Sequence, residues 1–335
     1  MHLSATGRQR LTLHFANTAA AFAAQVGEQY AATPTIAQTI YNKIVEDGNP
    51  FLKMINVMPV SEIKGERVGL SLSNKVASRT DTSSTGERVP KLLDNTDAKL
   101  YECFATEFDV ALTYAKIDMW AKFPDFASRY MQMVRQAIGS DMVLTGWMGT
   151  SAAATTNIST NPLLQDVNIG WLQKIRTFNS ASQYVIGTVG VPIELGSANF
   201  KNLDVLAHTA KQRIPVQFRE RPDLVLLVGS GVMSYAEETY YELNGNTPTE
   251  KAMLSGRITR AFAGLPTIAP PFFPANALMI TPLSNLSIYY QDSSVRRLQK
   301  DKPEKNQVQD FNSVNLGYVV EEELMTSLVE NITYL

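Results

Sequence analysis

The sequence predicts a mixed α+β protein, and three observations support this fold class. From Pro124 to Met148, apolar or aromatic residues recur mostly at steps of three and four, as on one buried face of a long helix. Two short runs, Val68–Leu72 and Phe104–Tyr114, alternate apolar with other residues and predict strands. Between them lies Ala77–Ala98, a polar stretch longer than the loops of most compact domains.

The long helix has sequence signals at both ends. Pro124 suits a first helical turn, and the carboxylate of Asp125 lies near the positive end of the helix dipole. Gly146 and Gly149 are expected to loosen and then end the helix. Two roles fit the pattern, a central core helix and an architectural spine.

Composition limits the classes of function. The chain has 335 residues, 44% of them hydrophobic, which is enough for about two domains. A formal net charge of −2 gives no long-range attraction to nucleic acid or to an anionic membrane. Cys103 is the only cysteine and the three histidines lack ligand spacing, so neither a disulfide nor a zinc site is expected. The most apolar run, Leu224–Val228, is too short to span a bilayer, and we expect a soluble protein.

Two helices are expected at the N-terminus. The first carries Leu11, Phe15, Phe22 and Val26 on one face and ends at Gly27. The second starts at Thr33-Pro34 and ends at Gly48, with three isoleucines expected to be buried: Ile36, Ile40 and Ile44. The first helix is either part of the core or a detachable N-terminal segment, and the pattern alone favours neither.

The two alternating runs and the polar stretch between them predict a hairpin. An isolated two-stranded hairpin is marginal in water, so a projecting one needs a surface to lie on. In a symmetric assembly that surface belongs to a neighbouring subunit. The alternative is a surface hairpin folded back on its own domain.

The second half of the chain alternates helices and strands. Its expected helices are one opened by Asn161-Pro162 and running through Ile175, one at Leu203–Arg213 and one at Val232–Leu243. The expected strands include Phe51–Val60 earlier in the chain, short strands within Gln183–Ile193, and Leu224–Val228, Ile258–Phe262, Ala277–Thr281 and Leu286–Gln291. The last two segments, Val308–Val320 and Leu324–Tyr334, are either closing strands or a short helix and a strand. The charged residues from Arg296 to Lys305 are expected to form a solvated turn.

No catalytic constellation is recognisable. The turn Gly229-Ser230-Gly231 follows an apolar strand but lacks the spacing of nucleotide-binding motifs. Cys103 is expected in the core, and the acidic run Glu321-Glu322-Glu323 on a solvated face. Three tryptophans are expected to be core or interface anchors: Trp120, Trp147 and Trp171.

Several long blocks resemble the major capsid protein of the peduovirus group of temperate tailed phages. These blocks are Asn56–Glu66, Asp118–Phe123 with Asp125-Phe126, Asn161–Val167 with Gly170–Lys174, and the segment from Gly264 to Arg297. Together they span about Pro34 to Val320, nearly the whole chain. The segment from Ser180 to Asn199 is shorter than the family pattern implies.

The resemblance implies the Hong Kong 97-type capsid fold, an α+β fold with an N-terminal arm, an extended E-loop hairpin, a spine helix in a peripheral domain, and an axial domain. The implied division is 1–33 as a cleaved N-terminal segment, 34–65 as the N-arm, 66–115 as the E-loop, 116–160 as the peripheral domain with the spine helix, 161–282 as the axial domain, and 283–335 as a return to the peripheral domain.

The implied function is that of a structural protein and not of an enzyme. Copies would assemble as pentamers and hexamers into the icosahedral head shell in the cytoplasm of a bacterial host, with a scaffold, a maturation protease and a portal as partners. The shell would enclose double-stranded DNA without specific contacts, and no cofactor or membrane is implied. The expected processing site comprises Tyr30, Ala31, Ala32 and Thr33, and the expected inter-subunit contacts of the E-loop are Arg79, Asp81, Glu87, Arg88 and Lys91.

Two alternatives differ in observable ways. An encapsulin-type compartment would share the fold, bind cargo and undergo no maturation cleavage. A soluble α/β enzyme using the turn at Gly229–Gly231 would be a monomer or small oligomer with a ligand.

Overall fold

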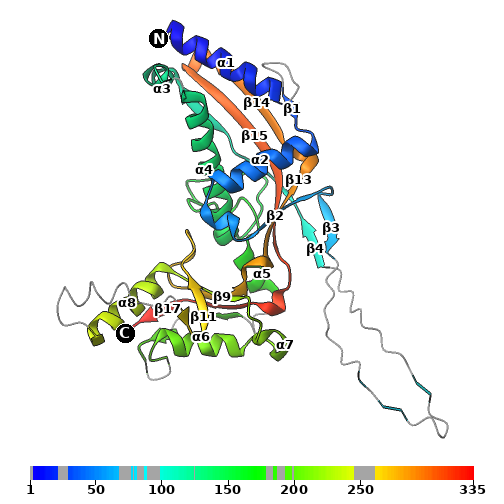
Figure 1. Ribbon diagram of the computed structural model, residues 1–335, viewed down its shortest axis with the longest axis vertical. Coiled ribbons are helices and arrows are strands. Elements are labelled where there is room, and N and C mark those ends of the chain that lie inside the picture. Colours follow the sequence, from blue (N-terminus) through cyan, green and yellow to red (C-terminus); the bar gives the residue numbers. More distant parts are fainter. Residues whose placement is uncertain are drawn as a thin grey trace.

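The computed structural model describes residues 3–21, 29–67, 77, 79–80, 87–88, 99–123, 125–178, 184–186, 193–197, 200–244 and 261–335. These residues build an elongated molecule from two sheets with helices packed on them (Figure 1). The N-terminal helix lies at one end of the molecule and the C-terminus lies in the opposite half. No helix among these residues is both long and apolar enough to cross a membrane.

The first sheet is organised around one long strand, β15. Strand order is β1-β14-β15-β13-β2, and β5 and β6 also pair with β15. The first half of β15 pairs with β14 and β6, and the second half pairs with β13 and β5. The bounds are β1 Tyr30–Ala31, β2 Asn56–Val60, β5 Phe104–Glu107, β6 Val110–Thr113, β13 Leu286–Gln291, β14 Arg296–Lys302 and β15 Gln307–Val320.

The charged run from Arg296 to Lys305 was expected to be a solvated turn, and this expectation is wrong. Most of it forms β14, and only the 3-10 helix η4, Pro303–Lys305, turns the chain back into β15. Arg297 and Gln299 are buried in β14. The charge pattern gave a wrong prediction because the guanidinium of Arg297 pairs with Asp310 on β15 inside the sheet.

Among the described residues, five helices pack on this sheet: α1 Ala5–Ala21, α2 Pro34–Asp47, α3 Tyr114–Trp120, α4 Phe126–Met148 and α5 Trp171–Phe178. Helix α4 confirms the predicted long helix, with Asp125 as its N-cap residue and Gly149 as its C-cap residue. Gly146 does not loosen the helix; it is buried, and a Cβ there would collide with the Trp171 ring. The absence of a side chain at Gly146 lets the Trp171 ring pack directly against α4.

Helix α2 is present as predicted, but its buried face differs. Ala37, Tyr41 and Ile44 are buried, whereas Ile36 and Ile40 are half-buried. The face is set by Tyr41, because its ring stacks on Tyr290 of β13 with centroids 4.0 Å apart. The expected end of the first helix, Phe22 to Gly27, lies outside the described residues.

The second sheet has the order β10-β11-β9-β12-β16-β7, and a small parallel pair, β8 with β17, lies beside it. Its strands are β7 Tyr184–Ile186, β9 Leu224–Val228, β10 Ala261–Phe262, β11 Leu265–Ile268, β12 Leu278–Pro282 and β16 Ser327–Glu330; the small pair is β8 Ile193–Leu195 and β17 Ile332–Tyr334. The helices of this half are α6 Leu203–Gln212, α7 Val216–Arg219 and α8 Ser230–Asn244.

Two expected elements differ from the structure because of local backbone geometry. The helix expected from Asn161 begins only at Trp171, as α5 Trp171–Phe178, since Leu164 has a positive φ of 58° that interrupts a helix. The segment expected to be extended from Phe51 starts with the 3-10 helix η1, Pro50–Lys53, before β2.

A tryptophan-centred core joins α4, α5 and the first sheet. The rings of Trp147 and Trp171 are fully buried, and their centroids are 4.8 Å apart. Trp171 Nε1 donates to the carbonyl of Ser287 (3.0 Å), and the Tyr318 hydroxyl donates to the carbonyl of Met142 (2.9 Å). Helix α5 therefore packs in the core of the first sheet, whereas the implied division places residues 161–178 in the axial domain.

The chain crosses between the two sheets twice near its C-terminal end. It passes from β12 to β13 through η2, Leu283–Asn285, and from β15 to β16 through a turn that includes η5, Glu323–Met325. Within residues 283–335, β13 to β15 belong to the first sheet, whereas β16 joins the second sheet and β17 pairs with β8.

A two-stranded ribbon leaves the side of the molecule (Figure 1). Its strands, β3 Lys64–Arg67 and β4 Lys99–Glu102, pair with one another and with no other described strand. The expected second arm, Phe104–Tyr114, is instead part of the body, because β5 and β6 pair with β15 and Tyr114 begins α3. The expected first arm, Val68–Leu72, lies outside the described residues.

Candidate functional site

The four residues of the expected processing site lie together at the edge of the first sheet. Tyr30 and Ala31 pair with β14, and the N–H of Ala32 donates to the carbonyl of Val295 (2.8 Å). Thr33 then provides the N-cap of α2. The backbone of this junction is therefore held by hydrogen bonds on one side, which the sequence pattern did not indicate.

Helix α1 precedes the junction and packs against α3 and β14. At its start, the N–H and the hydroxyl of Ser4 both donate to Asp118 Oδ1, at 3.0 and 2.5 Å. Leu3 and Leu11 are buried in the first core cluster. The exposed ion pair of Arg8 with Asp301 (3.4 Å) adds little, as surface pairs usually do.

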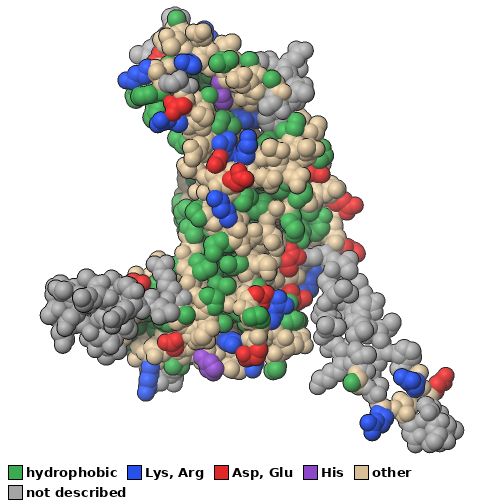
Figure 2. Space-filling view, viewed as in Figure 1, with side chains coloured by type: hydrophobic (Ala, Val, Ile, Leu, Met, Phe, Trp, Pro, Cys, Tyr) green, Lys and Arg blue, Asp and Glu red, His purple; other side chains and the backbone are tan. Residues whose placement is uncertain are grey.

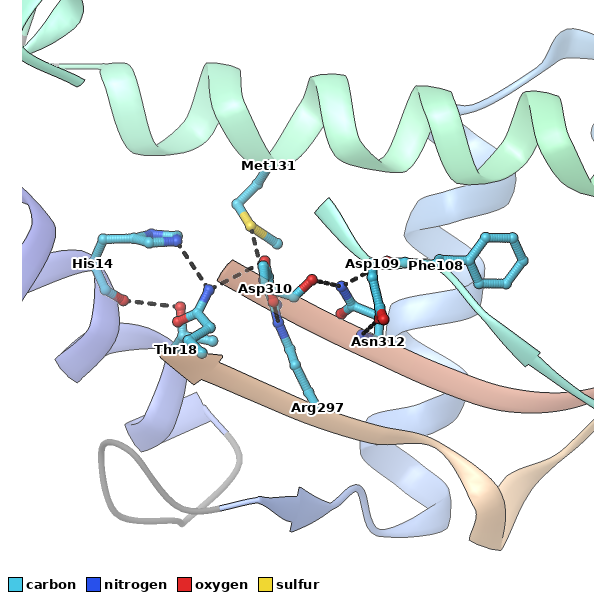
Figure 3. Close-up of polar contacts among 9 residues, drawn as sticks. His14, Thr18, Phe108, Asp109, Met131, Arg297, Asp310 and Asn312 are labelled. Carbon is cyan, nitrogen blue, oxygen red and sulfur yellow. Dashed lines mark hydrogen bonds and ion pairs between the residues drawn. The ribbon is translucent and has the colours of Figure 1, made fainter. Parts of the chain in front are cut away.

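A buried polar cluster lies under α1 (Figure 3). Arg297 Nε and one terminal nitrogen donate to the two oxygens of Asp310, at 3.0 and 2.5 Å, and these side chains are only 9% and 2% exposed. Gln299 Nε2 lies 3.3 Å from Asp310 Oδ2 and 3.3 Å from His14 Nε2. His14 thus connects α1 to a buried ion pair, and breaking such a pair is strongly destabilising.

The environment of His14 favours its neutral form. Burial lowers the pKa of His14 below its usual 6.5, and the charge of Arg297 lowers it further, whereas Asp310 raises it. A neutral ring accepts the Gln299 amide hydrogen at Nε2. The sequence pattern already placed His14 and Leu11, three residues apart, on one helix face, although the buried ion pair beneath them is not visible from it.

We predict that docking of α1 weakens at acidic pH. Because the folded-state pKa of His14 lies below 6.5, the stability that it contributes is complete above pH 6.5. This contribution is lost as the pH falls from 6.5 through the lowered pKa. Limited proteolysis of α1 and thermal unfolding across this range measure the effect.

His14→Gln provides the control, because it retains a hydrogen-bonding side chain without titrating there. The variant should show a flatter pH dependence than the wild type. Equal slopes for both proteins would contradict the assignment to His14.

The expected contact residues of the hairpin are only partly described. Arg79, Glu87 and Arg88 are exposed, whereas Asp81 and Lys91 lie outside the described residues. On the face seen in Figure 2, basic and acidic side chains are interspersed over the body. This agrees with the near-neutral net charge and gives no field of one sign for binding a polyanion.

The acidic run Glu321–Glu323 does not form the solvated face that was expected. Glu321 Oε1 accepts the hydroxyl hydrogen of Tyr289 (2.8 Å), and Glu322 Oε1 accepts from Lys99 Nζ (3.0 Å). Glu323 also pairs with Lys99. This run of like charges is partly buried because Lys99, on another strand, pairs with two of its carboxylates.

The Gly229–Gly231 turn and Cys103, which could have belonged to an enzyme active site, have structural roles instead. A Cβ at Gly229 would collide with the carbonyl of Pro274, and the N–H of Gly231 donates to the carbonyl of Ala275 (3.1 Å). The backbone of Pro274 and Ala275 therefore packs directly against this turn. Cys103 is buried, and burial raises the pKa of its thiol to about 11. Across the described ranges, no three side chains of His, Cys, Asp or Glu cluster as metal ligands would.

Two of the three tryptophans have the expected core role. Trp147 and Trp171 are fully buried core anchors, whereas Trp120 at the end of α3 is exposed beside Phe123.

The comparisons with known proteins agree with this structural character. The family model described as "Phage major capsid protein, P2 family" matches residues 9–332. The capsid protein of Escherichia phage P2 is 34% identical over 323 residues, covering 92% of this chain and 89% of that protein. The major capsid protein of Serratia phage KSP20 is 30% identical over 323 residues, covering 93% and 91%.

A solved structure also matches. A chain from the satellite phage P4 procapsid including the size determination (Sid) protein superposes with a TM-score of 0.71 at 34% identity, covering 88% of this chain and 99% of that chain. The chain has the mixed α+β Hong Kong 97-type capsid fold that the resemblance implied. It belongs to the P2 family of phage major capsid proteins, which form the head shell of the virion, and it is not an enzyme.

Proposed function

We propose that copies of this protein close the icosahedral shell as pentamers and hexamers, with the β3–β4 hairpin of each copy lying across a neighbour. The supporting observation is that β3 and β4 pair only with each other among the described strands. Leu100 of β4 is 73% exposed, and Ile63 just before β3 is also exposed. A two-stranded ribbon with apolar side chains in water is marginal alone and gains stability on a neighbouring subunit.

The domain division follows from the same proposal, adjusted to the strands. Residues 34–65 act as the N-arm, and the E-loop extends between β3 and β4. The first sheet with α4 as its spine forms the peripheral part, and the second sheet forms the axial part around the five-fold and quasi-six-fold axes. Double-stranded DNA lies against the inner wall without specific contacts, since the net charge of −2 offers no strong electrostatic attraction.

The N-terminal segment is removed during maturation by a phage protease, after a scaffold has guided assembly and a portal has taken one vertex. The segment 1–33 includes α1, which contacts the body through Asp118, Asp301, Gln299 and a few apolar residues. A cut near Tyr30–Thr33 requires β1 to leave β14, because a paired strand does not fit a protease cleft. Processing is therefore coupled to release of this edge strand.

We predict that subunits in mature particles begin within Ala31 to Pro34. Intact-mass spectrometry of purified particles, compared with unassembled subunits, measures the N-terminus. A mature subunit starting at Met1, or at His2 after methionine removal, would contradict the processing proposal.

A second prediction concerns the loop beyond the ribbon. Replacing Ala77–Ala98 by a short Gly-Ser connection should leave a folded protein that forms few or no closed shells, since the surface lying on the neighbour is lost. Circular dichroism tests folding, and electron microscopy of co-expressed particles tests assembly. The same-length control replaces the segment with a Gly-Ser sequence and separates loss of side chains from loss of reach. Normal shells from the shortened variant would refute the E-loop role.

A further inference from the structure

We propose that Lys99, Glu322 and Glu323 form an ionic clamp that sets the direction in which the β3–β4 hairpin leaves the body. This inference rests on the proposed role of the hairpin in contacting a neighbour. If the hairpin spans two subunits, then its exit angle determines how those subunits tilt against each other. The clamp residues would then act as positioning residues for the curvature of the shell.

Lys99 binds two carboxylates of the turn that follows β15. Lys99 begins β4, and its Nζ donates to Glu322 Oε1 (3.0 Å) and pairs with Glu323. Its ammonium also lies 5.9 Å from the ring centroid of Phe178, at the end of α5. The three charged side chains are 20%, 13% and 14% exposed, so the pairs are screened much less than a surface pair.

Hydrogen bonds hold Glu322 in place. The side chain of Asn285 donates to the carbonyl of Glu322 (2.9 Å) and accepts from its N–H (2.7 Å). Glu322 Oε1 also accepts from the N–H of Leu324 (3.3 Å). Because Lys99 binds the carboxylate of Glu322, Lys99 is itself restrained, and the clamp transmits the position of the body to the hairpin.

The hairpin also contacts the body at a second point, close to Lys99. The ring of Tyr101 on β4 meets the ring of Tyr289 on β13 edge to face, with centroids 5.1 Å apart. Gly65 on β3 allows the Tyr101 ring to lie over it, because a Cβ there would collide with that ring. With one attachment alone, the hairpin could rotate about that point. Two attachments, at Tyr101 and at Lys99, fix the direction in which the hairpin leaves the body.

The hairpin also contains a pair that provides a contrast. Lys64 Nζ lies 2.7 Å from Glu102 Oε1, but these side chains are 69% and 41% exposed. Both residues belong to the hairpin, since Lys64 is on β3 and Glu102 on β4. Their pair holds the two strands together and cannot orient them against the body.

Loss of the lysine charge should have a directed effect. Without it, the hairpin offers no positive charge to the two partly buried carboxylates, so the attraction that holds β4 to the turn is lost. The Tyr101–Tyr289 contact remains as a pivot. The hairpin would then sample a wider range of exit angles in an otherwise folded subunit.

The test compares Lys99→Gln and the double variant Glu322→Gln with Glu323→Gln against Lys64→Gln, which removes a hairpin charge but no clamp. Hydrogen exchange of the unassembled subunits measures mobility at Lys99–Glu102. Electron microscopy of shells co-expressed with the scaffold measures the distribution of diameters. Exchange in β13 and β15 reports whether the body stays folded.

We expect exchange at Lys99–Glu102 to accelerate about tenfold in Lys99→Gln and in the double variant, with β13 and β15 unchanged. Their shells should vary in diameter, whereas Lys64→Gln should resemble the wild type. Wild-type exchange and a single shell diameter in Lys99→Gln would overturn the clamp, and so would equal effects of Lys64→Gln. If the wild type itself forms no shells, the proposed function fails, while the exchange data still decide whether the clamp exists.

Discussion

One buried side chain, that of Asn285, connects both chain crossings between the two sheets. Its amide nitrogen donates to Thr281 Oγ1 (3.1 Å) at the end of β12 and to the carbonyl of Glu322 after β15. Its amide oxygen accepts from the N–H of Glu322, and its carbonyl accepts from Glu321. The placement of the two sheets and of the clamp carboxylates therefore depends on the same hydrogen-bonded group, which in a buried setting must remain fully satisfied.

The two segments proposed to act during assembly attach to the first sheet in different ways. Helix α1 and β1 lie along its β14 edge, through a few apolar residues, Gln299 and backbone pairing. The β3–β4 hairpin attaches at the opposite end of β15, through Tyr289 and the Glu322 turn. Two separately attached segments suit the proposed shell subunit, in which the N-terminal segment is released and the hairpin contacts a neighbour.

Local patterns predicted much of this fold, and distant partners explain the errors. The 3.6-residue period predicted α4, and the apolar run predicted β9 and its turn into α8. The charged run that became β14 could not be predicted, because the partner that neutralises Arg297 lies on another strand. The pairing of the processing junction with β14 and the binding of Glu322 by Lys99 are likewise contacts between segments far apart in the chain. The resemblance supplied the family and the proposed position of the cleavage junction, whereas the contacts of His14 and Lys99 emerged only from the packing.

Size-exclusion chromatography with negative-stain electron microscopy tests whether this subunit closes shells with its own copies, on the protein expressed alone and together with the neighbouring phage genes. Closed shells are expected, or pentamers and hexamers that become shells when scaffold and protease are present. A single small oligomer under every condition would show that the subunit does not assemble in this way.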